Sequence, residues 1–310
     1  MYFSDGHSDY LYGAVNRGYD FSSPVKGQSL SLGRLKAGGV KLQLLAAWMD
    51  IDLKRSYLSQ FVSMYDAYRT LLEEHPELVE LTPDFDPAGD RIAVMLTVEG
   101  GEAVEGEKDI LRSLYRMGVR AMTLTWNNRN ELANPALKKY KGGLTFLGKQ
   151  IVREMGRIGM AVDLSHLNDA GIDDVLAEGV TVFASHSNSR AVTPSPRSLC
   201  DEHIREIARR GGTIGVNFYY KQLTEARSAV ISDVVRHALH IAEVGGIGCL
   251  AIGSDFEGMD RYPEGLSDPS HLPALAAALK NAGMSEADLA ACCGENLMRF
   301  CKGLCSGSGS

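Results

Sequence analysis

YFSDGHSD, residues 2–9, opens the chain with the pattern that decides its fold. A short apolar run from Tyr2 to Asp5 is followed at once by Gly6, His7 and Asp9. The run has the length and composition of a buried strand, and polar residues begin where that strand ends. This stretch therefore predicts a strand that carries functional side chains at its carboxyl end.

The same kind of run recurs along the chain, with segments of helical period between the runs. The predicted strands are Tyr2 to Asp5, Val40 to Trp48, Ile92 to Val98, Ala121 to Trp126, Met160 to Leu164, Val180 to Ala184, Thr213 to Asn217 and Cys249 to Gly253. Strands that alternate with helices pair in parallel through right-handed crossovers, and eight such units close a barrel. We therefore expect an α/β fold, a single (β/α)8 TIM-type barrel with extra C-terminal helices over residues 1–305. A doubly wound open sheet is the alternative.

Three segments lie outside the repeating pattern. The acidic stretch from Glu73 to Asp90 is interrupted by prolines and is predicted to be a surface excursion. Leu272 to Lys302 is predicted to form two or three helices that cover the side or base of the barrel. Residues 306–310, SGSGS, have the composition of a linker and are predicted to be a disordered tail.

The composition excludes several classes of partner. The chain has 32 Lys and Arg against 39 Asp and Glu, a formal net charge of −7, which argues against a nucleic acid or an anionic membrane as the main partner. The longest apolar runs have the length of strands, and the opening residues show no secretory signal. The cysteines form no CxxC pair, which favours reduced thiols. We expect a cytoplasmic protein that acts on a small molecule, and a homodimer is left open.

Candidate metal ligands stand directly after several predicted strands. They are His7 and Asp9 after the first strand, Glu99 after the third, His166 after the fifth, His186 after the sixth and Asp255 after the eighth. In a barrel these strand ends converge on one face, where the active sites of this fold lie. Imidazoles and carboxylates together suit zinc or a similar divalent ion, and one carboxylate can bind a different metal with each oxygen. The sequence therefore predicts a binuclear hydrolytic centre.

Each of these residues, taken alone, also has a structural explanation. Glu99 and Asp255 could cap helices, and His166 and His186 could be hydrogen-bonded histidines at strand ends. The combination on one face favours function, because no structural cause requires it. The remaining histidines are predicted to be solvated surface residues: His75, His203, His237, His240 and His271.

Three further residues could contact a substrate. Arg190 follows His186 closely, and a guanidinium is the natural bidentate partner of a free carboxylate, although a surface arginine is the alternative. Asn217 and Tyr219 stand at the end of the seventh predicted strand and could line the same pocket.

Six motifs carry a resemblance to a known family. They are DGHSD at residues 5–9, VEG at 98–100, DLSH at 163–166, ASHSNSR at 184–190, GSDFEG at 253–258 and GEN at 294–296. Over nearly its whole length the sequence resembles the membrane dipeptidase (renal dipeptidase) family of zinc peptidases, a branch of the amidohydrolase-like barrels. The first and fifth motifs are similar to the family's DGHND and GSDFDG.

The resemblance implies a role for each matching residue. One Zn²⁺ would be bound by His7, Asp9 and Glu99, and the other by Glu99, His166 and His186. Arg190 would hold the substrate carboxylate, and Asp255 would bind the substrate amine and carry out the proton chemistry. The implied enzyme is a binuclear zinc dipeptidase, a metallopeptidase that hydrolyses dipeptides with a free C-terminal carboxylate through a metal-bridging hydroxide.

The sequence departs from the family at one position. The mammalian members have a histidine in an LTH motif after the fourth strand, where this chain has Trp126 followed by Asn127. An indole N–H donates one hydrogen bond but cannot take a proton, so Trp126 or Asn127 could serve only as an oxyanion donor. Two alternatives therefore stay open. One is a related barrel hydrolase acting on another small amide, a lactam or an acyl-amino acid, and the other is a metal-binding scaffold without turnover.

Overall fold

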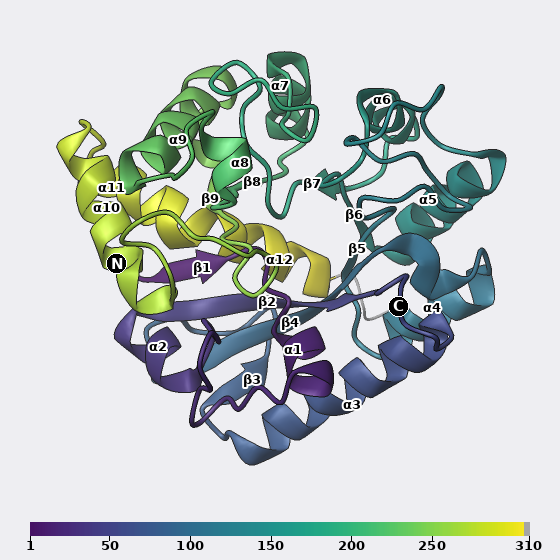
Figure 1. The fold of residues 1–310 in the computed structure, drawn as a ribbon, viewed down its shortest axis with the longest axis horizontal. Helices are drawn as coiled ribbons and strands as arrows, with labels where there is room; N and C mark the ends of the chain where they lie inside the picture. Colours follow the sequence, from purple (N-terminus) through teal and green to yellow (C-terminus); the bar gives the residue numbers. More distant parts are fainter. Residues whose placement is uncertain (307–310) are drawn as a thin grey trace.

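Parallel strands form the centre of the structure, a computed structural model that describes residues 1–306 (Figure 1). The strands are β1 Phe3–Asp5, β2 Val40–Trp48, β3 Leu78–Glu80, β4 Ile92–Glu99, β5 Ala121–Thr123, β6 Ala161–Asp163, β7 Val182–Phe183, β8 Ile214–Val216 and β9 Leu250–Ile252. Eight of them follow the order β7-β6-β5-β4-β2-β1-β9-β8. A bridge between Ala184 and Ile214 joins the two ends of this series. The ring is the nearly closed (β/α)8 barrel that the sequence predicts, and the open sheet is excluded.

Strand β3 is the element that the sequence pattern missed. It lies within the acidic stretch 73–90, so the prediction of a surface excursion is wrong for these three residues. β3 pairs with the first half of β4, from Leu78 opposite Ile92 to Glu80 opposite Val94. A strand of three residues is too short to show an alternating pattern, and the flanking prolines and acids hide it further.

Helices cover the outside of the ring (Figure 1). They are α1 Tyr10–Asn16, α2 Leu32–Ala37, α3 Tyr57–Glu74, α4 Lys108–Arg116, α5 Phe146–Ile158, α6 Asp169–Ala177, α7 Asp201–Arg209, α8 Tyr220–Leu223, α9 Ile231–Gly245, α10 Leu272–Asn281, α11 Glu286–Ala290 and α12 Asn296–Ser306. Short 3-10 turns form η1 Gly101–Val104, η2 Ile247–Cys249 and η3 Pro269–His271, and η4 Ala291–Glu295 is π-helical. No helix within residues 1–306 is both long and apolar enough to cross a bilayer.

Strand β2 shows why the sequence pattern reveals the barrel. Its run VKLQLLAAW is buried except at Lys41 and Trp48, which are half-buried, because a parallel strand in a barrel is covered on both faces. Leu42 and Leu44 pack in the cluster inside the ring. Leu45 belongs instead to the larger cluster between the strands and the helices. A continuous apolar run is therefore the expected signal here, rather than an alternating one.

Helix α12 closes the base of the barrel (Figure 1). Its buried side chains Leu297, Met298, Cys301 and Leu304 pack in the same cluster as Leu42 and Leu44 near the start of β2. The base is one of the two positions that the sequence predicts for the C-terminal helices, and the carboxyl ends of the strands stay open for a site. α12 ends at Ser306, the first residue of the predicted tail, and residues 307–310 of that tail lie outside the described residues.

Candidate metal centre and active site

Each predicted ligand lies at or just beyond the carboxyl end of a strand. His7 follows β1, Asp9 precedes α1, Glu99 ends β4, His166 follows β6, His186 follows β7 and Asp255 follows β9. The first five are buried and Asp255 is half-buried. The closure of the ring therefore brings residues from five strands to one face, as the sequence predicts.

Glu99 lies at the centre of the cluster, and its two carboxylate oxygens face different groups. Its Oε2 is 3.4 Å from Nε2 of His7, and its Oε1 is 2.9 Å from Nε2 of His166. Asp9 Oδ1 lies 3.6 Å from His7 Nε2, and His186 Nε2 lies 3.6 Å from Glu99 Oε1. Two groups of candidate ligands result: His7, Asp9 and Glu99 form one, and Glu99, His166 and His186 form the other. Within each group the candidate ligand atoms lie within 4.8 Å of one another, so each group could hold a metal ion. The Glu99 carboxylate joins the two groups.

Several nitrogen and oxygen atoms that could bind a metal lie close together in this cluster, and some of them have no hydrogen-bond partner. Within residues 1–306, the buried atoms His7 Nε2 and Asp9 Oδ1 have no hydrogen-bond partner. The Nε2 atoms of His166 and His186 approach to 2.9 Å. Buried polar atoms are normally paired, so nitrogen and oxygen donors that converge in this way fit a divalent cation between them. The residues present therefore fit a metal centre.

Hydrogen bonds at the other ring nitrogen orient the two later histidines. Nδ1 of His166 lies 2.9 Å from Oδ1 of Asn127, and Nδ1 of His186 lies 2.6 Å from Oγ of Ser185. When each Nδ1–H donates these bonds, each Nε2 is left unprotonated, which is the form that binds a metal. Asn127 therefore accepts a bond from His166, a role that differs from the oxyanion donor considered from the sequence.

Two buried aspartates that sequence reasoning did not single out hold the ligand loops. Asp163, the last residue of β6, accepts hydrogen bonds from the backbone N–H groups of Ser165 and Ser185 and from the Ser185 hydroxyl. Asp5, the last residue of β1, accepts bonds from the backbone N–H groups of His7 and Ser254 and from the Ser254 hydroxyl. Each aspartate ties a ligand loop to the loop after another strand. The sequence signal that could have found them is their position, because each is the first residue of a motif that contains a candidate ligand histidine.

Burial and crowding of charge shift the pKa values in the cluster. Burial, followed by the charge of a neighbouring carboxylate, raises the pKa of Glu99 to about 8, and burial raises that of Asp255 to about 7. Burial alone would lower the pKa of His7, but the surrounding carboxylates outweigh it and hold that pKa well above its usual value. Burial lowers the pKa values of His166 and His186. A bound cation would favour both the ionised carboxylates and the neutral imidazoles.

The backbone is also unusual at this place. His166 has φ of 70° and Asp255 has φ of 63°, in the left-handed region that residues other than glycine rarely adopt. Such conformations persist where the surrounding structure imposes them, and they gather at functional sites. Both residues line the cavity that adjoins the cluster.

A small cavity of about 150 Å³ adjoins the cluster. Its lining includes the predicted residues Glu99, Trp126, His166, Tyr219 and Asp255. The Asn217 side-chain amide donates a 3.1 Å hydrogen bond to Oδ2 of Asp255, so it contacts the site as well. A second cavity, of about 370 Å³, shares Asp9 and Trp126 with the first cavity. Tyr12, Arg17 and Trp48 form much of the rest of its wall. Together they form a cleft over the candidate metal centre.

Arg190 does not line this cleft. Its Nη1 and Nη2 donate to the Asp169 carboxylate at 2.6 and 2.7 Å, and its remaining bonds go to backbone carbonyls of residues 195–198. The structure therefore does not bring Arg190 to the place where the sequence analysis expected it. The reason is that Asp169, at the start of α6, occupies the guanidinium.

Arg197 is a buried cation that lines the cavity beside the cluster, and sequence reasoning missed it. It is 4% exposed, its Nη1 donates to Oγ of Ser187 at 2.8 Å, and its Nη2 donates to the carbonyl of His186 at 2.9 Å. Its Nε has no hydrogen-bond partner within the described part of the chain. Burial lowers its pKa to about 10, so it stays charged at neutral pH. Nothing in the spacing around Arg197 distinguishes it from Arg190.

The histidines predicted to be solvated lie outside the cluster, but three of them are buried. These are His75, His203 and His237, which are 8%, 5% and 0% exposed. The surface prediction is wrong for them, because each fills a position on the inner side of its segment. His240 is hydrogen-bonded to Asp201, and His271 stays partly exposed beside Asp268.

The fold and these donors define a class, the (β/α)8 barrels with a candidate metal centre at the carboxyl ends of their strands. The membrane dipeptidase family, peptidase family M19, matches residues 1–304. The chain therefore belongs to this family, and the resemblance seen in the sequence motifs is confirmed.

Individual relatives support the same assignment. A protein described as an uncharacterized dipeptidase of Schizosaccharomyces pombe is 34% identical over 255 residues, 79% of this chain and 62% of that protein. Dipeptidase 3 of Rattus norvegicus is 32% identical over 315 residues, 95% of this chain and 63% of that protein. The chain thus spans slightly less than two thirds of the length of these relatives.

A solved structure agrees over nearly the whole of both chains. It is a metallopeptidase from Rhodobacter sphaeroides liganded with a phosphinate mimic of the dipeptide L-Ala-D-Ala. Its TM-score is 0.89 at 25% identity, over 97% of this chain and 98% of that chain.

Proposed function

We propose that the protein is a binuclear zinc dipeptidase that hydrolyses dipeptides with a free C-terminal carboxylate. The observation that carries this proposal is the position of Glu99, whose two oxygens face two separate groups of ligands in a member of the membrane dipeptidase family. A phosphinate resembles the tetrahedral stage of peptide hydrolysis, and the Rhodobacter sphaeroides metallopeptidase binds such a mimic of a dipeptide.

The ligand set we propose divides evenly about Glu99. His7, Asp9 and Glu99 would hold one ion, and Glu99, His166 and His186 would hold the other. Mixed imidazole and carboxylate donors without cysteine suit zinc in a catalytic site, where a position is kept for water or substrate. When bound, the pair of ions would lower the pKa of water toward neutrality and polarise the scissile carbonyl.

Asp255 is the group we propose for proton transfer. Its carboxylate lines the cleft beside Glu99, and the Asn217 amide holds one of its oxygens at 3.1 Å. A carboxyl group fixed in this way can take a proton from the attacking water and deliver it to the leaving amine. Trp126 and Tyr219 lie on the walls of the same cavity, where they would limit the room for the substrate.

Arg197, rather than Arg190, is the residue we propose for binding the substrate carboxylate. It is the buried cation of the cleft, and its Nε–H has no partner within the described residues. Arg190 already forms a bidentate pair with Asp169. A cation that holds the carboxylate at a fixed distance from the metals selects dipeptides over longer peptides.

Matched substrates test this assignment. The kcat/KM of the wild type should be much higher for L-Ala-L-Ala than for its C-terminal amide, because only the free acid gains the charged hydrogen bond. Arg197→Ala should remove most of this difference, whereas Arg190→Ala should keep it. Equal kcat/KM values for acid and amide in the wild type would favour the broader amide hydrolase. Absence of any turnover in the zinc-loaded protein would favour the metal-binding scaffold.

We further propose a reducing compartment such as the cytoplasm. Cys200, Cys249, Cys292, Cys293 and Cys301 are free thiols in the structure. Mass spectrometry of protein alkylated directly on cell lysis should find these thiols reduced. A homodimer stays a prediction, and sedimentation of the purified chain is its test.

A further inference from the structure

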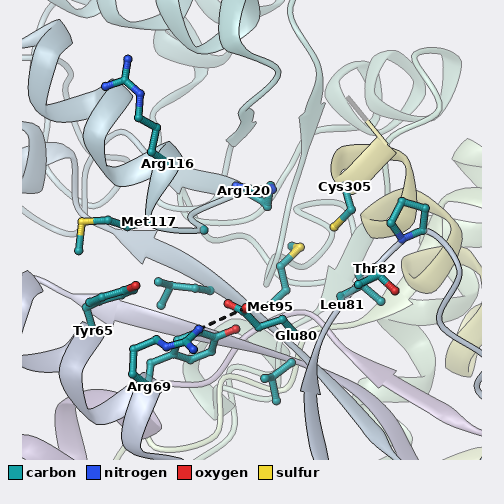
Figure 2. Close-up of a pocket in the computed structure, with 15 residues that line it drawn as sticks. Tyr65, Arg69, Glu80, Leu81, Thr82, Met95, Arg116, Met117, Arg120 and Cys305 are labelled. Atoms are coloured by element: carbon teal, nitrogen blue, oxygen red, sulfur yellow. Dashed lines mark ion pairs between the residues drawn. The ribbon is translucent and has the colours of Figure 1, made fainter. Parts of the chain in front are cut away.

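The polar side chains of two cavities differ in how well they are paired. In the hollow beside β3 and the first half of β4, Arg69 pairs with Glu80 at 3.3 Å, which Figure 2 marks with a dashed line. Arg120, on the same wall, donates to the carbonyls of Tyr115 and Val119 at 2.9 and 3.2 Å. Both cations already have partners, so neither needs a ligand. The smaller cavity, of about 150 Å³ beside the candidate metal centre, is different.

Three side chains on the wall of the smaller cavity contain a buried atom that has no hydrogen-bond partner within residues 1–306. The atoms are Oδ1 of Asp9, Nε of Arg197 and Oε1 of Gln222. In the proposed function, the first atom binds a metal ion and the second belongs to the cation that holds the substrate carboxylate. Gln222 has no role there, although buried polar atoms are normally paired.

Gln222 lies on α8, and the backbone around it is fixed. Its own N–H donates to the Tyr219 carbonyl at 2.9 Å. The carbonyl of Leu223, the next residue, accepts bonds from the Thr193 hydroxyl at 2.9 Å and from Nε2–H of His237 at 3.1 Å. The Gln222 side chain is 7% exposed, so water does not replace the missing partner of its Oε1. An unpaired carboxamide in this position is costly in the free protein and is stabilised when a ligand supplies the hydrogen bond.

The residues that line the two cavities of the cleft indicate which part of a dipeptide would contact Gln222. Arg197, Asp255 and Gln222 line the smaller cavity, and none of them lines the larger cavity of about 370 Å³. If Arg197 holds the C-terminal carboxylate as proposed, the C-terminal residue of the substrate lies in the smaller cavity. The side chain of that residue is then the part of the substrate that contacts Gln222, and the larger cavity is left for the N-terminal residue.

The chemistry of the smaller cavity limits the kind of side chain that fits. A carboxamide offers an oxygen acceptor and N–H donors, and a half-turn of the group exchanges its two ends. It therefore pairs best with a group that both donates and accepts. An acidic side chain would add a negative charge near the carboxylates of Asp255 and Asp260, which line the same cavity. An apolar side chain would leave the Gln222 carboxamide unpaired, and the small volume favours a short side chain.

We propose that Gln222 selects dipeptides whose C-terminal residue has a short, uncharged, hydrogen-bonding side chain, such as that of asparagine. The inference rests on the proposed dipeptidase function and names the substrate class of that same site. A site that pairs a polar group of its substrate discriminates against an apolar analogue, because the polar group of the site then stays buried and unpaired. Asparagine and leucine form a suitable pair of substrates, since their side chains have nearly the same shape.

Steady-state kinetics of the zinc-loaded protein with three dipeptides tests the inference. In the wild type, kcat/KM should be at least about tenfold higher for L-Ala-L-Asn than for L-Ala-L-Leu, and L-Ala-L-Ala reports whether the protein is a dipeptidase. Gln222→Met keeps the length of the side chain but removes its hydrogen bonds. It should lower kcat/KM for L-Ala-L-Asn about tenfold or more and raise it for L-Ala-L-Leu, a gain that misfolding cannot produce.

Lys221→Met is the matched control. Lys221 precedes Gln222 on α8, is exposed and lines neither cavity of the cleft, so this variant should keep the asparagine-to-leucine ratio of kcat/KM within about twofold. Calorimetric dissociation constants of phosphinate mimics of L-Ala-L-Asn and L-Ala-L-Leu give a measurement without turnover, and the asparagine mimic should bind more tightly.

The inference alone is overturned if the wild type hydrolyses L-Ala-L-Ala but has equal kcat/KM values for the asparagine and leucine dipeptides. It is also overturned if the two mimics bind equally, if Gln222→Met keeps the wild-type ratio, or if Lys221→Met loses it. Absence of turnover with all three dipeptides would overturn the proposed function and this inference with it.

Discussion

The position of Asp255 is compatible with two roles, metal binding and proton transfer. Its ligand atom groups with those of His7 and His186, so it could bind a metal, yet it also lines the cleft that would receive the substrate. The five other ligands already supply three donors to each proposed ion, with Glu99 shared. We therefore place Asp255 in proton transfer, a role that depends on its basicity and not on its shape.

Asp255→Asn separates these roles. The amide keeps the size and hydrogen-bonding reach of the carboxylate but is not a base, so we expect both zinc ions to stay and kcat to fall by about 10² to 10⁴. Zinc content by elemental analysis and kcat for L-Ala-L-Ala are measured on the same preparation. Loss of one zinc would make Asp255 a ligand, and nearly full turnover would assign the proton to another group.

His237 is a buried residue that connects α9 to the loops around the site. Its Nδ1 accepts a 3.1 Å bond from the backbone N–H of Ser189, and its Nε2–H donates to the carbonyl of Leu223 at 3.1 Å. These two bonds require the neutral ring. Burial lowers the pKa of His237 to about 4, with the Arg236 charge acting in the same direction and the Leu223 bond and the Asp233 charge opposing it.

Because the pKa of His237 is lower in the folded chain than in the unfolded chain, the protein should lose stability as the pH falls. The unfolded chain binds the proton near pH 6.5 and the folded chain near pH 4, so stability is fully present above pH 6.5 and falls as the pH drops toward 4. Between pH 7 and pH 5, the titration of His237 should lower the free energy of unfolding of the wild type by about 2 kcal/mol. Urea unfolding at both pH values should show that His237→Gln is less stable at pH 7 but loses less on acidification. An equal loss in both proteins would contradict the buried neutral ring.

At the scale of elements, three strands converge on one carbonyl group. A Cβ atom at Gly6, Gly215 or Gly253 would come within 2.6, 2.1 or 1.9 Å of the Ser185 carbonyl oxygen. Gly6 and Gly253 directly follow β1 and β9, Gly215 is the middle residue of β8, and Ser185 directly precedes His186. The absence of side chains at these positions lets the strand ends approach closely enough to place the ligand.

Gly253→Ala tests this packing. The added methyl meets backbone and not a flexible side chain, so we expect a loss of about 1–3 kcal/mol in the free energy of unfolding, together with weaker zinc binding through displacement of His186. Gly248→Ala is the matched control, because a Cβ there has no atom within 4 Å and should change stability by less than about 0.5 kcal/mol. Unfolding and zinc titration of both variants give the comparison. Full zinc affinity in a folded Gly253→Ala protein would contradict the account.

The elements also show how far the sequence could predict the structure. The run Val40–Trp48 is predicted with its observed bounds because both faces of the strand are buried, whereas Leu78–Glu80 is too short to show a pattern. The ligand positions follow from strand ends, which a barrel brings together whatever the loops do. The choice between Arg190 and Arg197 depends instead on a loop conformation and on Asp169, a partner that proximity in the sequence does not reveal.

At the scale of the whole molecule, the barrel has two different ends. α12 lies at the base of the barrel (Figure 1), where its apolar side chains pack inside the ring. Buried polar groups and the candidate metal centre occupy the opposite end. The charged and strained groups at that end are costly without a cation, so metal binding and folding should be coupled. We therefore expect the stability of the molecule and its proposed activity to depend on the same residues.

Zinc titration of the metal-free protein, with the rate of L-Ala-L-Ala hydrolysis followed at each addition, tests the central claim most directly. If Glu99 joins two metal sites as proposed, zinc should bind to two equivalents per chain and the rate should reach its maximum as the second equivalent is bound. Full hydrolytic activity in protein shown by elemental analysis to contain no divalent metal would contradict the account.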